Sequence, residues 1–445
     1  GGRADGSGDG RDVVAIALTA LGGRASAQSL ELDDFLTGIL RDGVVLSPPA
    51  SGVNHEAHFI GGDSPQFGAL QQVNEEMSWQ LSNFPLSSSA GGFAYELDLE
   101  MGVLVRPTKS FGPIYGERPL TVGRGRFNLG MSYTQFSFDH LDDIDLQAGE
   151  MELVFTHADT DNDGGNLGNY IEGDVVTAAL AIDVESRVTS FVGSYGLRDG
   201  IDLGIVVPIV EVDMRARVDA TVRRLATSAS PDIHRFPNGT SRNSFERESS
   251  ARGVGDLVLR GKAKFLDQGS ILMAAMTDLR LPTGDEDNLL GTGRTTAKMG
   301  VVGSWNDPTF SPHAAASATF ASGNSNRNEL GYVFGLDWSV DPKLTLAADL
   351  LGRVALEARE VVVADETYRF NIETNPNLPA VVRQTDLPRL GIAEETTSRH
   401  YVDLAVGFKV NVAGNFLVTA NGLLPLADVG LRDEFSGLVG LDYSF

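Results

Sequence analysis

The carboxy-terminal stretch, residues 435–445, most constrains what this 445-residue chain can fold into. Its large apolar side chains share one parity, and its small and polar side chains share the other. A β-strand sends successive side chains to opposite faces, so the stretch predicts a strand with one apolar face and one polar face. The chain ends on Phe445, with Tyr443 two residues before it. We take this strand as the element around which the rest is organised.

An alternating strand that closes a chain on an aromatic residue is typical of outer-membrane β-barrels. In those proteins the last strand seals the barrel, and the barrel-insertion machinery recognises it; we expect Phe445 to serve that contact. No apolar run reaches the roughly 20 residues that a membrane helix needs. Because only helices and closed barrels satisfy their backbone in lipid, a membrane-spanning form of this chain has to be a barrel. We expect it in the outer membrane of a Gram-negative bacterium, surrounded by lipid.

Charge and cysteine content exclude several classes of protein. The chain has 35 Lys and Arg against 60 Asp and Glu, a net charge of -25, which argues against nucleic acid as a partner. Acidic loops suit a surface rich in divalent cations. The absence of cysteine excludes thiol catalysis, cysteine-based zinc sites and disulfides. The hydrophobic content of 42% is too high for a disordered chain.

The amino-terminal part predicts three segments. Residues 1–27 are predicted to be a signal peptide, with an apolar core and the small residues Ala25-Ser26-Ala27 before the cleavage site; a buried core helix is the alternative. Residues 30–46 have apolar residues at helical spacing, so we expect a short amphipathic helix, followed by an irregular segment to about residue 90. Residues 93–106 predict a hairpin or the first pair of barrel strands.

The remainder, residues 124–445, predicts the barrel itself. Its alternation recurs in twelve segments, of which residues 330–340 are the clearest. A soluble sandwich also alternates, but here short and long connections alternate as well, as in transmembrane barrels. We therefore expect an all-β antiparallel barrel of about 12 strands, or 14 if residues 93–106 belong to the wall. Residues 28–123 would then be a plug or a periplasmic segment. The predicted strands are 125–138, 174–196, 201–215, 255–266, 271–283, 297–306, 312–321, 330–340, 344–356, 400–411, 415–426 and 433–445.

Three motifs resemble one known family. The first is Ser87-Ser88-Ser89-Ala90-Gly91-Gly92-Phe93 followed by Phe111-Gly112-Pro113-Ile114-Tyr115 with Glu117-Arg118. The other two are Gly255-Asp256-Leu257 with Arg260-Gly261-Lys262, and the stretch at 281–291. The chain resembles the family of outer-membrane proteins associated with the MetA (meta-cleavage) pathway of phenol degradation, and more distantly the outer-membrane long-chain fatty-acid channels. The resemblance implies transport of hydrophobic or aromatic compounds and no catalytic residues.

Inward-facing positions of the predicted strands combine charges of both signs with two aromatic rings. Basic residues there could meet the acidic group of an amphipathic solute; the alternative is that the charges pair with one another. The two phenylalanines could capture an apolar solute, or they could pack under the loop at 139–173. The candidate pathway residues are Arg126, Phe136, Phe138, Arg260, Lys262, Asp278, Arg280, Asp349 and Arg353.

Three prolines each follow an apolar run on a predicted strand: Pro208, Pro282 and Pro425. Proline lacks the N–H of the ladder and so favours a bulge, an edge or the end of a strand. One hypothesis is a bulge that lets an apolar solute leave sideways into lipid. The alternative is that these strands end at the outer rim.

One acidic segment predicts a weak Ca²⁺ site. Asp159, Asp161 and Asp163 match the first half of a calcium-binding loop, but Tyr170 stands where the loop needs a bidentate glutamate. A solvated acidic turn is the alternative, and we expect no other cofactor.

The sequence therefore predicts a channel for passive uptake of small hydrophobic or aromatic compounds, and not an enzyme. The rival functions are a barrel hydrolase, such as a lipase or protease, and a structural or adhesin barrel. His313 and Ser317 share an inward face, but four residues along a strand span about 13 Å, so these two cannot form a catalytic dyad.

Overall fold

The computed structural model describes most of the chain from residue 31 onward. The predicted signal peptide, residues 1–27, lies outside the described residues. No helix in the described part of the chain is long and apolar enough to cross a membrane. The described residues are 31–47, 59, 65–83, 88, 92–98, 103–106, 108–159, 167, 172–226, 234–305, 307–323, 327–372, 377 and 379–445.

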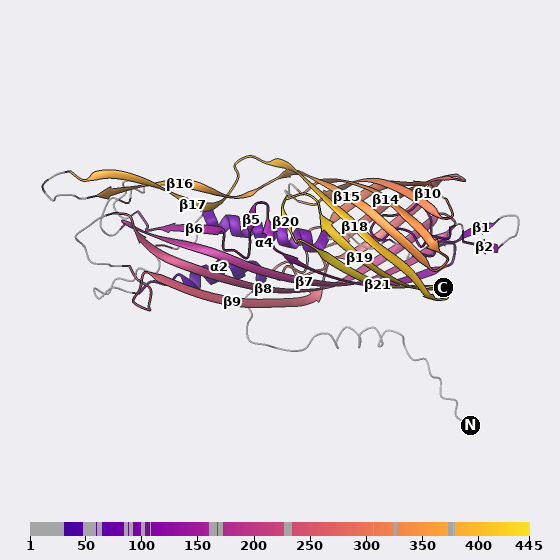
Figure 1. The fold of residues 1–445 in the computed structure, drawn as a ribbon, viewed down its shortest axis with the longest axis horizontal. Helices are drawn as coiled ribbons and strands as arrows, with labels where there is room; N and C mark the ends of the chain where they lie inside the picture. Colours follow the sequence, from indigo (N-terminus) through magenta and orange to yellow (C-terminus); the bar gives the residue numbers. More distant parts are fainter. Residues whose placement is uncertain are drawn as a thin grey trace, which may run out of the picture. The chain divides into compact units, whose positions relative to one another are not determined.

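Twelve antiparallel strands close into a ring, in which each strand pairs with the next along the chain and the last pairs with the first (Figure 1). The prediction of a barrel of about 12 strands is confirmed. The alternative of 14 is wrong, because β1 (Glu96–Asp98) and β2 (Val103–Val105) pair with each other in a separate sheet. The strands of the ring are β3 (Phe127–Phe138), β7 (Asp174–Arg198), β8 (Ile201–Arg224), β10 (Leu257–Gln268), β11 (Ile271–Leu281), β12 (Thr296–Trp305), β13 (Phe310–Ala321), β14 (Glu329–Asp341), β15 (Leu344–Ala358), β18 (Thr397–Ala413), β19 (Phe416–Pro425) and β21 (Ser436–Ser444).

The carboxy-terminal residue closes the ring. The backbone N–H of Phe127 donates to the carbonyl oxygen of Phe445 at 2.9 Å, and the N–H of Phe445 donates back to the carbonyl of Phe127 at 2.9 Å. The two rings stack with centroids 5.6 Å apart, and Tyr443 stacks on Phe445 at 5.8 Å. The predicted sealing strand therefore lies where the sequence places it.

The outer face of the ring is apolar, as a lipid-facing wall requires. On β14, Phe334 is 57% exposed and Trp338 is 46% exposed, whereas Asp337 between them is fully buried. Similar exposed apolar side chains occur on the other strands of the ring, and on β7 this belt begins at Phe191. The period of two in the sequence therefore separates a lipid face from an inner face.

The five short turns lie at one end of the ring. Three of them contain a glycine with positive φ: Gly200 (76°), Gly269 (69°) and Gly414 (52°), a conformation that costs glycine little. The long connections lie at the other end. Because transmembrane barrels have short periplasmic turns and long external loops, we assign the short-turn end to the periplasm and the other to the cell exterior.

β7 and β8 run far past the external end of the wall and carry a sheet extension (Figure 1). There β8 changes partner from β10 to β9, and β6 pairs with β7. The predicted end of β8 at residue 215 is too early, since the strand continues to Arg224, whereas the predicted start of β7 at residue 174 is confirmed. The predicted links at 225–254 and 357–399 are not only loops, since they contain β9, β16 and β17. The remaining strands are β4 (His140–Leu141), β5 (Ile144–Asp145), β6 (Met151–Thr156), β9 (Arg242–Val254), β16 (Val361–Ile372), β17 (Val381–Ile392) and β20 (Leu431–Arg432).

Two helices pack against this extension. α2 (Leu32–Gly43) confirms the predicted amphipathic helix, and its residues Phe35 and Leu36 are fully buried in the core formed with the extension. The predicted irregular segment up to residue 90 is wrong, because it contains α4 (Pro65–Asn83). The helices therefore lie at the external end, which favours a plug over a periplasmic segment; the domain boundaries themselves stay a prediction.

Asp174, at the outer tip of β7, anchors the extension. It is almost fully buried; Nδ1 of His234 lies 2.8 Å from one of its carboxylate oxygens, and Nε of Arg224 donates to the other at 3.1 Å. Burial alone would raise the pKa of Asp174, but the hydrogen bonds from His234 and Arg224 outweigh it and hold the pKa below its ordinary value. The tip is thus stabilised by an ionised carboxylate.

Candidate functional site

Residues 108–123, here called the inner segment, lie inside the ring near the periplasmic end. Four of its backbone amides donate to inward side chains of the wall, three of them at 2.9 Å. Phe111 donates to the hydroxyl of Thr345 at 2.9 Å, Gly116 donates to Asp349 at 2.9 Å, and Val122 to Asp202 at 2.9 Å. Wall side chains thus satisfy the irregular backbone, which lets it stay inside the barrel.

Charge pairs hold the same segment. Glu117 accepts from Nζ of Lys262 at 2.7 Å and from Arg260 at 3.1 Å, and Arg118 pairs with Asp337 at 3.4 Å. Lys262 also donates to the carbonyl of Arg118 at 3.1 Å. Because all of these side chains are largely buried, the pairs are screened weakly by water.

His313 belongs to this structural cluster. Its Nε2 lies 2.9 Å from Asp349, and its Nδ1 lies 3.7 Å from Asp337. Gly116 covers it so closely that a Cβ there would lie 2.5 Å from Nε2. The imidazole is thus packed between two aspartates and the inner segment, with its ring fully buried.

The carboxyl end of α4 covers the lumen from the external side. The indole N–H of Trp79 donates to Glu329 at 2.9 Å, and Arg353 donates to Glu329 at 3.0 Å and to the side chain of Gln80 at 2.8 Å. Arg353 also lies over the ring of Tyr401 at 4.2 Å. The helix end is therefore tied to β14 and β15.

One turn earlier in α4, Glu76 forms an ion pair with Arg327, from the external connection before β14. The hydroxyl of Tyr401 donates to Glu76 at 3.4 Å. Burial would raise the pKa of Glu76, but the neighbouring Arg327 guanidinium and its hydrogen bond bring the pKa below the ordinary value. Glu76 is therefore an ionised anchor of the cover.

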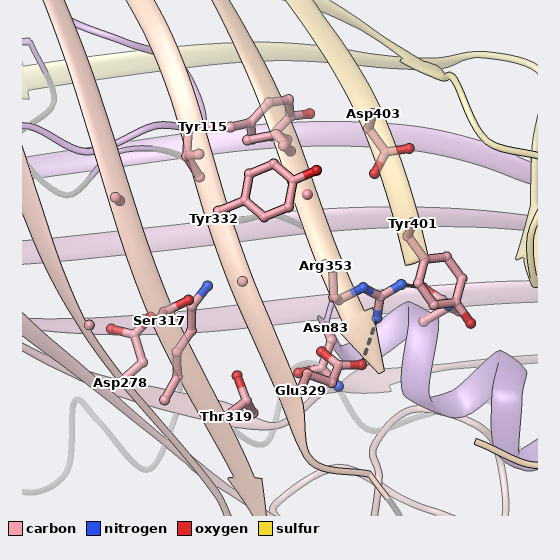
Figure 2. A pocket seen from close by; sticks show the side chains of 18 of the residues that line it. Asn83, Tyr115, Asp278, Ser317, Thr319, Glu329, Tyr332, Arg353, Tyr401 and Asp403 are labelled. Carbon is pink, nitrogen blue, oxygen red and sulfur yellow. Dashed lines mark hydrogen bonds and ion pairs between the residues drawn. The ribbon is translucent and has the colours of Figure 1, made fainter. Parts of the chain in front are cut away.

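A cavity of about 290 Å³ lies between the end of α4 and the inner segment (Figure 2). Asn83 reaches it from α4 and Tyr115 from the inner segment, while Tyr332, Arg353 and Asp403 lie on the wall around it. The volume is at the lower end of the roughly 300–1,000 Å³ of small-molecule sites. An apolar cavity of roughly 150 Å³ already holds benzene, so this one has room for a substituted single ring.

The structure brings six of the nine predicted pathway residues together around this cavity: Phe136, Phe138, Arg260, Asp278, Arg280 and Arg353. Lys262 and Asp349 instead hold the inner segment. Arg126 lies before β3 at the periplasmic rim, with its guanidinium 4.5 Å from the ring of Tyr95. It does not line the cavity.

Most charges of the cavity form ion pairs with one another, which was the alternative to binding a solute. Arg260 donates to both oxygens of Asp278 at 2.7 and 2.8 Å. Glu329, which forms an ion pair with Arg353, has the inward parity on its strand. The alternation of the sequence could therefore have identified it. Glu117 could not, since it lies outside any periodic segment.

Phe136 and Phe138 line the cavity and also pack in the buried core, while capture of a solute by these rings stays a prediction. Their rings lie 5.5 Å apart, edge to face, and both line the cavity. They also belong to the buried core that includes Leu141 and Leu146 from the connection after β3. They thus form an apolar border between the cavity and the extension.

The three prolines differ in position. Pro282 follows the last residue of β11, and Pro425 is the last residue of β19, so both stand at strand ends. Pro208 lies within β8, at the change of partner from β10 to β9. The β7–β8 register runs through Ser190 and Pro208 without a shift, so there is no bulge on that side of β8, and a sideways exit at Pro208 stays a prediction. The missing N–H falls where β8 has no ladder partner to receive it.

The structure does not test the predicted Ca²⁺ site. Asp159 is exposed in the connection after β6, and Asp161 and Asp163 lie outside the described residues. A Ca²⁺ site in this external loop stays a prediction.

A family model matches residues 156–422, more than half of the chain. Its description is "Putative MetA-pathway of phenol degradation". The chain belongs to this family. The resemblance read from the three sequence motifs is therefore confirmed. No curated protein sequence matches the chain at a significant level.

Solved structures with similar folds include channels and a protease. The COG4313 outer membrane channel from Pseudomonas putida F1 is 14% identical, with 73% of this chain and 97% of that chain covered and a TM-score of 0.41. A Pseudomonas aeruginosa FadL homologue is 10% identical, with 72% and 89% covered and a TM-score of 0.28. The outer membrane protease OmpT from Escherichia coli is 9% identical, with 72% and 97% covered and a TM-score of 0.25. These likenesses are too distant to assign an activity.

Proposed function

We propose that this protein is an outer-membrane channel for the passive uptake of small hydrophobic or aromatic compounds. The observation that carries the proposal is the cavity of about 290 Å³ inside a closed, lipid-facing barrel. Membership of a family described by phenol degradation supports a solute with a single aromatic ring. The barrel encloses the transport pathway, and the cavity is a binding site along it.

The amino-terminal part acts as the plug of this channel. The end of α4 covers the cavity through Glu329 and Arg353, and the inner segment closes it below through Glu117. Passage therefore requires that one of these covers moves. We propose no catalytic step, and His313 has a structural role between Asp337 and Asp349.

The exit from the barrel can lie through the periplasmic end or sideways through the wall. Pro425 favours a sideways exit, since it lines the cavity and ends β19. Pro208 and Pro282 are the other candidates for such an exit. A Pro208→Val variant with unchanged uptake would remove Pro208 from this route.

The test is uptake of labelled toluene by cells that carry the full chain in their outer membrane. Initial uptake is expected to exceed that of cells with an empty vector. Ala315→Trp fills the cavity and should abolish the gain, whereas Ala314→Trp, on the exposed outer face of the same strand, should keep it. Equal uptake with and without the protein would refute the proposal and favour an adhesin or structural barrel.

A further inference from the structure

Two cations of the cavity have no hydrogen-bond or ion-pair partner among the residues that the structure describes. Arg260 forms an ion pair with Asp278, and Arg353 forms one with Glu329. Arg280 and Lys298 also line the cavity, yet neither forms a hydrogen bond or ion pair within the part of the chain that the structure describes. Arg280 is half-buried and Lys298 is exposed to the cavity, so an anion that enters the cavity can reach both charges.

The two side chains lie on neighbouring strands and can act together. Asp278 and Lys298 are register partners across β11 and β12, and Arg280 is the partner of Thr296 in the same pair of strands. Arg280 and Lys298 are therefore diagonal neighbours, a separation that long side chains bridge. Asp278 does not neutralise them fully, because both of its oxygens already accept from Arg260.

Hydroxyl groups and apolar side chains complete the surroundings. Thr296 and Thr319 line the cavity beside Lys298, and Thr319 is its register partner on β13. Val302 and Leu351 line the cavity further along the wall toward the periplasmic end. An anion at the cations would thus have hydroxyl donors near it and an apolar space beside it.

Asp278 and Glu329 lie near this pair but already accept from Arg260 and Arg353, and two further acids line the cavity. Asp403, on β18, and Asp433, after β20, line it without an ion pair in the described part of the chain. β18, which holds Asp403, is separated from β11 and β12 along the ring by β13, β14 and β15. A carboxylate would be repelled there and attracted to Arg280 and Lys298, which fixes the orientation of a bound solute.

We infer that the cavity binds an aromatic monocarboxylate, with its carboxylate on Arg280 and Lys298 and its ring in the apolar space beside them. This inference rests on the proposed function, since it names the substrate class of the same cavity. An arginine can hold a carboxylate by two parallel bonds, and charge-assisted bonds are the strong ones. A neutral ring of the same size lacks these bonds and binds more weakly.

Calorimetric titration of the full chain in detergent tests the inference, with benzoate and its neutral analogue benzamide as probes. The unsubstituted protein should bind benzoate about ten- to a hundredfold more tightly than benzamide, the effect of one or two charge-assisted bonds. The double variant Arg280→Gln, Lys298→Gln should lose this preference and keep benzamide binding. Arg280→Lys, which retains the charge, should keep most of it.

Lys343→Gln is the matched control, since it removes one positive charge at the short turn before β15. It should leave benzoate binding unchanged. Equal affinity for benzoate and benzamide, or an unchanged preference in the double variant, overturns the inference. The proposed function is tested separately, because toluene uptake involves no carboxylate. If the protein takes up toluene but shows no preference for benzoate, only the inference is refuted. If it shows neither, the proposed channel is refuted as well.

Discussion

Glu117→Gln should release the inner segment from the barrel wall. Glu117 is the shared partner of Lys262 at 2.7 Å and Arg260 at 3.1 Å, and its side chain is only 12% exposed. Removing one partner from a buried ion pair costs about 3–5 kcal/mol, because the remaining charge stays buried. At about 3 kcal/mol, the population of the released segment rises roughly a hundredfold, since 1.4 kcal/mol is a factor of ten.

Hydrogen exchange measures this release directly. The amides of Phe111, Gly116 and Val122 donate to the wall, so their exchange rates should rise by the same factor as the released population. Single-channel recordings should show a matching rise in open time. Deleting residues 28–90, which removes α2 and α4, should raise the conductance by opening the external side.

The control is Glu248→Gln, in an exposed pair with Arg215 on the extension. Its side chain is 77% exposed, so the pair contributes little and exchange in the inner segment should not change. Unchanged exchange in Glu117→Gln, with a normally folded barrel, would show that the charge pairs do not hold the segment.

Three further predictions concern stability. The pKa of Asp174 in the folded protein is lowered from 3.8, so its contribution to stability is complete above pH 3.8 and is lost as the pH falls through the lower folded pKa. At that low pH, pepsin should cleave the extension more readily. Asp174→Asn should remove this pH dependence. Leu36→Ala should destabilise the packing of α2 on the extension by about 2–5 kcal/mol, seen as faster hydrogen exchange in β8 and β9. Gly196→Ala would place a Cβ 1.9 Å from the carbonyl oxygen of Gly123, so the fraction of heat-resistant folded barrel on a gel should fall.

The wall was predictable because alternation is a local signal. Each of the twelve predicted strands corresponds to one strand of the ring, and Phe445 lies at the seam. The same signal could have extended β8 further, since its alternation continues past the belt to Arg224. α4 could also have been found: Phe67, Leu70, Val73, Met77 and Leu81 recur at intervals of three and four.

The arrangement inside the ring could be predicted only in part. Parity alone identifies Arg260, Asp278 and Arg353 as inward residues. It cannot say that Glu117 meets Lys262, 145 residues away, because that contact depends on the path of a non-periodic segment through the lumen. The unpaired state of Arg280 has the same origin, since partners are settled by side-chain packing and not by period.

The pairing of β21 with β3 also bears on the order in which the barrel closes and the amino-terminal part docks. Ser88 donates its backbone N–H to Ile114 at 2.9 Å inside the wall, while α2 and α4 lie at the external end. A polypeptide that traverses a cylinder in this way either threads through it unfolded or is enclosed as the cylinder forms. Enclosure needs no threading of folded helices, so docking of the amino-terminal part would precede the zipping of Phe127 to Phe445. Pairing of β21 with β3 would then enclose the amino-terminal part inside the barrel.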